Sequence, residues 1–128
     1  MFVHYLNERQ QAALLHYARE VMVADSAIDP EESLQMEVLR GQMRPGVQSE
    51  AVSLKQLCDL FSDRPSRVIL LMELLGMGYA DQELVARESK MINEIAGILM
   101  DTDALQAIES WVRRQLSLLK EAQELMEV

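Results

Sequence analysis

The sequence has few of the residues that interrupt helices or cross-link small domains. Its 128 residues include five Gly, three Pro and one Cys, and aromatic residues make up 5% of the chain. Gly and Pro are the strongest breakers of regular structure, so their scarcity favours long helices. A single cysteine excludes an internal disulfide framework. We expect Cys58 to be a small buried hydrophobic residue rather than a nucleophile, since neither histidine lies near it in the sequence.

Positive charge is also scarce. Lys and Arg number 12 against 21 Asp and Glu, which gives a formal net charge of −9. Proteins that bind nucleic acid gain most of their affinity from Lys and Arg, and anionic membrane surfaces attract the same residues. The charge balance therefore argues against a nucleic-acid partner. It favours cations or the basic surfaces of other proteins.

Long apolar segments and secretory signals are missing as well. The longest apolar stretch, residues 68–80, is interrupted by Glu73 and is too short to span a bilayer. The first residues lack the basic and then apolar pattern of a secretory signal. We therefore expect a cytoplasmic protein with no membrane insertion. We also expect Glu73 to lie on the one strip of its helix that faces water, because a buried carboxylate would need a partner.

No arrangement of residues typical of an enzyme is present. The chain has no Ser-His-Asp or Cys-His set, no Gly-rich phosphate loop, and neither an HExxH nor a CxxC motif. His4 and His16 have no spacing that suggests a ligand set. We therefore predict a non-enzymatic protein. The nine Met residues indicate a pliable core, or alternatively a groove for a partner helix.

The sequence does contain repeated capping signals followed by apolar residues at helical spacing. Asn7 and Gln10 predict a capping box, and Pro30 and Pro65 predict first helical positions. These signals predict six helices. The first ends near residue 24, the second runs from 30 to before 44, the third from about 53 to 61, the fourth from 65 to before a turn at 81–83, the fifth to about 100, and the sixth from a cap at 101–103 to the C-terminus. We expect one compact helical bundle over residues 1–128, because short loops place helices antiparallel to each other.

The same periodicity predicts which residues form the core. The fourth helix is apolar nearly all round from residue 68 to 75, as is typical of the central helix of a bundle. The inward residues predicted for the other helices are Leu34, Met36, Val38 and Leu39 in the second, Met91, Ile95 and Ile98 or Leu99 in the fifth, and Leu105, Ile108, Val112, Leu116, Leu119 and Met126 in the sixth.

An internal duplication connects these helices. The pattern A-D-x-x-[I/L]-x-x-x-E occurs at residues 24–32 and again at residues 80–88. Each occurrence joins the end of one predicted helix to the start of the next. Repeated units tend to pack similar faces together, so the pattern predicts two duplicated helix–turn–helix hairpins related by a pseudo-two-fold axis.

Both occurrences, and particularly residues 21–32, resemble the TerB-like family of bacterial tellurite-resistance proteins, which is also found in membrane-anchored J-domain cochaperones. The resemblance covers roughly residues 10–115. It implies an all-α fold with two duplicated hairpins, a role in stress response, and a metal-binding role for acidic residues in the turns. The residues that match the family are Asp25 and Glu32 in the first hairpin and Asp81 and Glu88 in the second. The family's usual Gly after the Asp is absent from both turns, and no J-domain signature is present, so a cochaperone role is not implied.

The four matching carboxylates have two interpretations. If the two hairpins face each other, the carboxylates gather at one end of the bundle, where calcium or magnesium would be the cation suited to oxygen ligands. Alternatively, Glu32 completes a capping box with Asp29 and both glutamates interact with helix dipoles. Val85 replaces the capping Asp in the second hairpin although Glu88 remains, which the second interpretation does not explain.

Two functional hypotheses follow. The first is a stress-response module that binds a divalent cation through Asp25, Glu32, Asp81 and Glu88, with no other cofactor. The second is a metal-free module that binds other proteins, including a homodimer formed through the sixth helix. That helix would be about 36 Å long and would extend past a bundle of this size.

Overall fold

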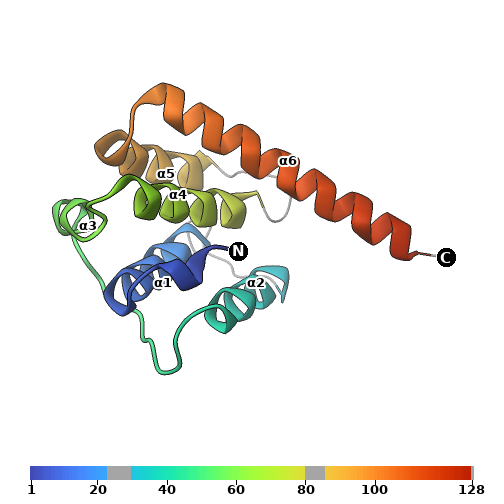
Figure 1. Ribbon diagram of the computed structural model, residues 1–128, viewed down its shortest axis with the longest axis horizontal. Coiled ribbons are helices and arrows are strands. Elements are labelled where there is room, and N and C mark those ends of the chain that lie inside the picture. The colour runs from blue at the N-terminus through green and yellow to red at the C-terminus, as the bar shows by residue number, and fades with distance from the viewer. Residues whose placement is uncertain (23–29, 80–85, 128) are drawn as a thin grey trace.

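The structure is a computed structural model that describes residues 1–22, 30–79 and 86–127. Within these ranges the chain is helical and contains no strand (Figure 1). The elements are a short 3-10 helix, η1 (Val3–Tyr5), and the helices α1 (Glu8–Met22), α2 (Pro30–Gly41), α3 (Leu54–Leu60), α4 (Arg64–Gly78), α5 (Ala86–Leu99) and α6 (Thr102–Met126). The predicted all-α class and the six helices are confirmed.

Side-chain caps open several helices, and those at Asn7 and Asp101 were predicted from the sequence. Helix α4 begins at Arg64, so Pro65 is its second residue and not, as predicted, its first. At the start of α1, the Gln10 amide N–H donates to Asn7 Oδ1 at 2.8 Å, and the Asn7 N–H donates to Gln10 Oε1 at 3.0 Å. This reciprocal pair satisfies two of the amide groups that a helix leaves free at its first turn. A second capping box opens α3 and single aspartate caps open α4 and α6, formed by Ser53 with Gln56, by Asp63 and by Asp101.

Helix α4 lies at the centre of the bundle, as predicted. It contacts α1, α5 and α6, and these three helices surround it in Figure 1. Four of its leucines, Leu70, Leu71, Leu74 and Leu75, are 0–3% exposed. Burying one such side chain contributes roughly 1.5–3 kcal/mol, so α4 supplies a large part of the hydrophobic stabilisation.

Helix α2 packs through only some of the residues predicted to point inward: Leu39 and Met36 do so, as predicted, but Leu34 and Val38 do not. Leu34 and Val38 are 59% and 55% exposed, whereas Leu39 is buried and Met36 is partly buried against the core. The prediction that Leu34 and Val38 point inward is therefore wrong. Apolar residues lie on several sides of α2, so their spacing alone does not select one face. Because α1 is the main neighbour of α2, only a narrow stripe is covered.

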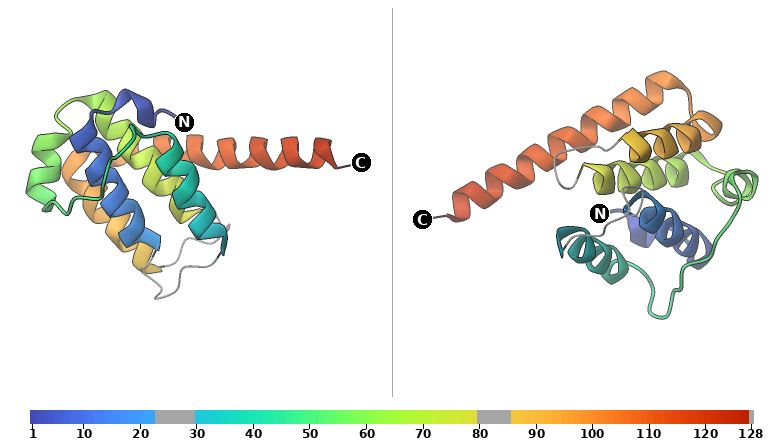
Figure 2. Two further views of the ribbon diagram at one scale, coloured as in Figure 1. Left: turned by 90° about the horizontal axis from the view of Figure 1, so that it is seen from below. Right: turned by 180° about the vertical axis from the view of Figure 1, so that it is seen from behind.

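The apolar seam of α6 is buried only along its first half. Ile108 and Val112 are buried, but Leu119 and Met126 are 52% and 78% exposed, so the predicted seam is wrong beyond Leu116. The reason is a difference in length. Helix α6 has 25 residues and is about 37 Å long, whereas α4 has 15 and is about 22 Å long. Figure 2 shows the second half of α6 projecting past the other helices.

Three further expectations can be compared with the structure. In α5, Leu99 is buried and Ile98 is 41% exposed, which decides between the two alternatives. Cys58 is only partly buried and its Sγ lies 3.7 Å from the Ile98 carbonyl oxygen. The expectation that Glu73 faces water is wrong, because this side chain is 17% exposed and pairs with the Met1 ammonium group at 3.0 Å.

Candidate interaction surface

The predicted cation ligands fall largely where the structure gives no description. Asp25 and Asp81 lie outside the described residues. Glu32 and Glu88 are each the third residue of a described helix, α2 and α5, but their side chains are outside the description. Among the described residues, no group of three or more His, Cys, Asp or Glu side chains is placed to hold a metal ion. The cation site therefore stays a prediction from the sequence.

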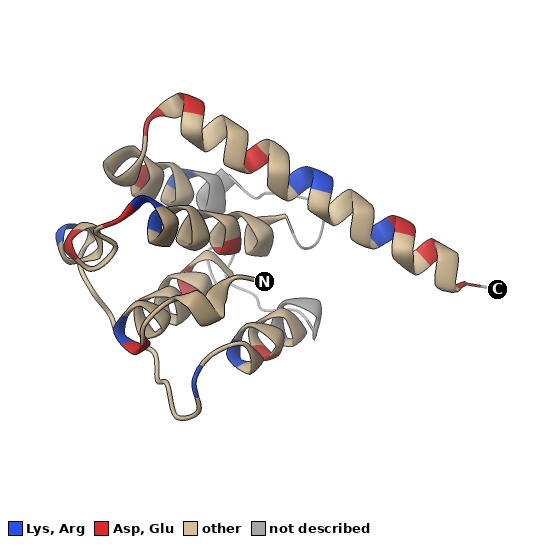
Figure 3. Ribbon diagram, viewed as in Figure 1, with Lys and Arg blue, Asp and Glu red and all other residues tan. Residues whose placement is uncertain are grey.

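The second half of α6 is the most exposed apolar part of the described chain. We call residues 117–126 the α6 arm. Its apolar side chains are spaced i, i+1, i+4, i+7 and i+8, so they share one face of the helix. They are Leu118 (64% exposed), Leu119 (52%), Ala122, Leu125 (85%) and Met126 (78%). The polar residues of the arm lie on the other side, and charged residues of both signs follow α6 in Figure 3. An uncovered apolar face of this kind marks an interaction site.

A groove lies at the root of the arm, between the N-terminal segment, α4 and α6. Its volume is about 150 Å³. Most of its lining is apolar, and the apolar lining residues are Met1, Phe2, Met72, Met77, Trp111, Leu116 and Leu119. The Phe2 and Trp111 rings pack with their centroids 6.3 Å apart, so Trp111 packs against the N-terminal segment. The groove continues directly into the apolar face of the arm, because Leu119 belongs to both.

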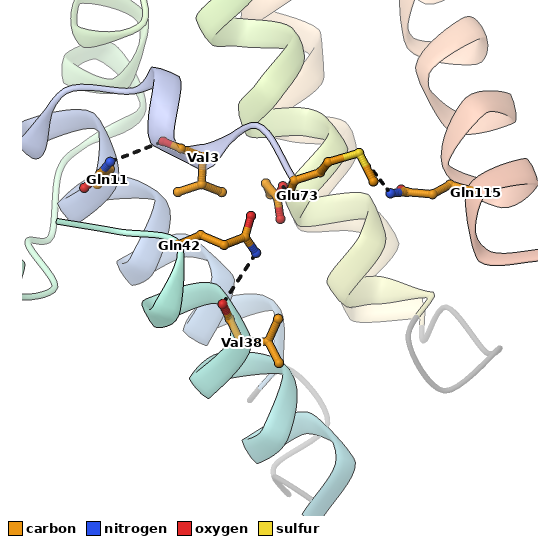
Figure 4. Close-up of polar contacts among 7 residues, drawn as sticks. Val3, Gln11, Val38, Gln42, Glu73 and Gln115 are labelled. Carbon is orange, nitrogen blue, oxygen red and sulfur yellow. Dashed lines mark hydrogen bonds and ion pairs between the residues drawn. The ribbon is translucent and has the colours of Figure 1, made fainter. Parts of the chain in front are cut away.

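The polar groups beside this groove are mostly paired with each other. Figure 4 shows Glu73 between Gln42, which directly follows α2, and Gln115 of α6. The Met1 ammonium neutralises the Glu73 carboxylate, and the Gln115 side-chain amide donates to the Met1 sulfur at 3.8 Å. Gln42 Oε1 is buried with no hydrogen-bond partner among the described residues. Because the one carboxylate in the lining is neutralised, the groove is suited to an apolar occupant.

A polar cluster holds α6 where it leaves the bundle. The Tyr79 hydroxyl donates to Glu109 Oε1, and Arg113 Nη2 donates to the Tyr79 hydroxyl at 2.9 Å and to Glu109 at 3.2 Å. The Arg113 guanidinium also lies over the Tyr79 ring, 5.0 Å from its centroid. Burial, followed by the hydrogen bond to Glu109, raises the pKa of Tyr79. These contacts join the end of α4 to the middle of α6 and fix the direction in which the arm projects.

Sequence reasoning missed this cluster and the groove. The i, i+4 spacing of Glu109 and Arg113 indicates an ion pair on one helix face. No local signal links that pair to Tyr79, which is 30 residues away along the chain. The groove likewise joins residues from the two ends of the sequence. Both features depend on tertiary packing.

Helices able to cross a membrane are absent from the described ranges, since none is both long and apolar enough. Comparisons with models of protein families, with curated proteins and with solved structures find no match for this chain. The resemblance to the TerB-like family therefore rests on the residues of the two turns alone.

Proposed function

We propose that this chain is a non-enzymatic, cytoplasmic helical module that acts by binding another protein through the apolar face of the α6 arm. One observation carries the proposal: Leu118, Leu119, Leu125 and Met126 are each more than half exposed on one continuous face. Burying a single such side chain contributes roughly 1.5–3 kcal/mol. An arm with several of them has ample free energy for association.

The way the arm is attached also supports binding. The first half of α6 packs on α4, and the cluster of Tyr79, Glu109 and Arg113 fixes its exit from the bundle. A binding element that is already ordered loses less conformational entropy on association than a disordered segment. An amphipathic helix presenting anchors at i, i+4 and i+7 is a recurrent mode of protein recognition. The arm therefore suits the docking of another helix.

Site-specific photo-crosslinking in cells tests this function. A photoreactive phenylalanine analogue replaces Leu125 on the apolar face, and in the matched control it replaces Ser117 on the polar face of the same arm. We expect one discrete adduct, identified by mass spectrometry, from position 125 but not from position 117. Adding Leu118→Glu should abolish it. Equal, diffuse labelling at both positions, or none at either, would contradict a binding role for this face.

A second candidate function, implied by the resemblance, is a stress-response role through a divalent cation bound by Asp25, Glu32, Asp81 and Glu88. One observation favours it: the N-terminal ends of α2 and α5 lie toward the same side of the molecule in Figure 2. Thermal melts with calcium, magnesium or a chelator test the idea. A stabilising shift that disappears in the double variant Asp25→Asn, Asp81→Asn supports it, whereas no shift at millimolar metal rejects it.

A further inference from the structure

We infer that the partner of the α6 arm is a second copy of this chain, paired antiparallel along α6 with Leu118 at the two-fold axis. The inference rests on the proposed function, since it names the protein that the arm binds. It follows from the spacing of apolar residues along α6, from the charges beside them and from the groove at the root of the arm.

A heptad strip runs along one face of α6. Its residues alternate four and three positions apart and are Trp111, Gln115, Leu118, Ala122 and Leu125. This spacing is typical of helices that pack along a seam with another helix. The strip is about 21 Å long, begins in the groove at Trp111 and ends near the tip of the arm. None of its residues belongs to the fully buried core.

The strip is complementary to itself when two copies run in opposite directions. Its middle residue is Leu118, so an antiparallel pair centred there brings Leu118 against the partner's Leu118. The exposed Leu125 then faces the partner's Trp111 at the groove. Ala122 lies opposite the partner's Gln115, which places a small side chain against a long one. This isologous arrangement covers the groove and the arm of both copies at once.

The charges beside the strip favour the antiparallel direction. Arg114 and Glu121 lie seven residues apart on the same edge of the strip, too far apart to pair with each other. The Arg114 side chain donates to the Ser110 carbonyl of its own helix at 3.4 Å, and neither residue forms an ion pair within the described part of the chain. In the antiparallel pair each Arg114 faces the partner's Glu121. In a parallel pair the edge that carries Arg114 and Glu121 would face the opposite edge of the partner's strip, so these charges would not meet.

The size of the contact indicates a reversible dimer. A stable interface buries about 800 Å² on each partner, more than a ten-residue arm provides alone. Contacts in the groove with Phe2 and Trp111 must therefore add to it. The resulting interface lies at the small end of the usual range, for which a dissociation constant of about micromolar order is expected.

Sedimentation of the full chain from submicromolar to millimolar concentration tests the dimer. We expect the wild type to change from monomer to dimer across this range and Leu118→Glu to stay monomeric. The matched control is Leu54→Glu on α3, which Figure 1 shows on the opposite side of the molecule from the α6 arm. This leucine is 37% exposed, and the variant should dimerise normally. Circular dichroism checks that each variant is folded. A wild type that is monomeric throughout would overturn the inference.

Charge reversal tests the register. Arg114→Glu and Glu121→Arg should each weaken the dimer about tenfold, because both symmetric pairs become repulsive, and the double variant should restore it. In a Cys58→Ser background, Leu118→Cys should form an intersubunit disulfide and Leu125→Cys should not. Failure of the double variant to recover, or disulfides at both positions, would overturn the antiparallel arrangement. A photo-crosslinked adduct with a different protein would overturn the homodimer and leave the proposed function standing.

Discussion

Helix α4 and the α6 arm are both rich in large apolar side chains, yet their surroundings are opposite. Leu70 and Leu74 of α4 are fully buried, whereas Leu118 and Leu125 of the arm are 64% and 85% exposed. Three helices surround α4, while the arm extends past the end of α4 and leaves most of its apolar face exposed. Apolar content thus sets how much surface can be buried, and the length of neighbouring helices decides how much is buried within one chain.

The largest expected effect contrasts these two regions directly. Leu74→Ala in α4 should lower the free energy of unfolding by about 2–5 kcal/mol, because it removes buried methyl groups and leaves a cavity. Leu125→Ala in the arm should change it by less than about 0.5 kcal/mol, as is usual for surface substitutions. Urea denaturation at submicromolar concentration measures both values on the monomer. Equal costs would mean that the arm is packed within a single chain.

The same contrast explains which parts of the fold could be predicted from the sequence. The capping box at Asn7 and Gln10 depends on neighbouring residues, so its effect is visible in the sequence. The central position of α4 follows from its lack of a polar face. The inward face of α2 and the end of the buried α6 seam depend on which helices lie alongside. For that reason Leu34 and Leu119 were assigned to the core although both are exposed.

The candidate sites also divide into features visible in the local sequence and features that depend on tertiary packing. The overhang of α6 follows from its length, and pairing through this helix was one of the two hypotheses drawn from the sequence. The groove and the contacts of Tyr79 with α6 join residues distant in the chain, and no spacing rule identifies them. The acidic turns remain a prediction, because Asp25 and Asp81 lie outside the described residues.

A buried polar residue gives the next largest effect. The Gln11 side chain is fully buried, donates to the carbonyls of Val3 and Leu6 at 3.2 and 3.1 Å, and accepts from the Arg44 amide at 3.0 Å. Gln11→Leu should cost about 2–3 kcal/mol, since it leaves backbone groups without partners in the interior.

The matched control for Gln11→Leu is Gln123→Leu on the arm. Gln123 is exposed, so this variant should unfold at nearly the wild-type urea concentration when both are measured as monomers. If Gln11→Leu were as stable as the control, the three hydrogen bonds would not be needed to hold η1 and the segment at Arg44 against α1.

The smallest expected effect concerns a buried and an exposed tyrosine. The Tyr17 hydroxyl donates to the Val52 carbonyl at 2.5 Å, and burial, with a further contribution from Glu20, raises the pKa of Tyr17 above its ordinary value of 10.0. A group whose pKa is raised in the folded state contributes its full stability below its unfolded pKa. It loses that contribution as the pH rises through the folded pKa. The wild type should therefore lose stability from about pH 10 upward, and Tyr17→Phe should lose less over the same range.

Urea midpoints at pH 7 and at several values above pH 9 measure this difference. At pH 7, Tyr17→Phe should be less stable than the wild type by about 1 kcal/mol, the usual contribution of one hydrogen bond. The gap should narrow as the pH rises. Tyr5→Phe is the control, because that ring is 70% exposed and its replacement should leave the pH dependence of stability unchanged. If the difference in stability between wild type and Tyr17→Phe stays constant to high pH, the Tyr17 hydroxyl ionises as readily in the folded chain as in the unfolded one. The segment at Val52 would then not be held against α1 by a protonated Tyr17.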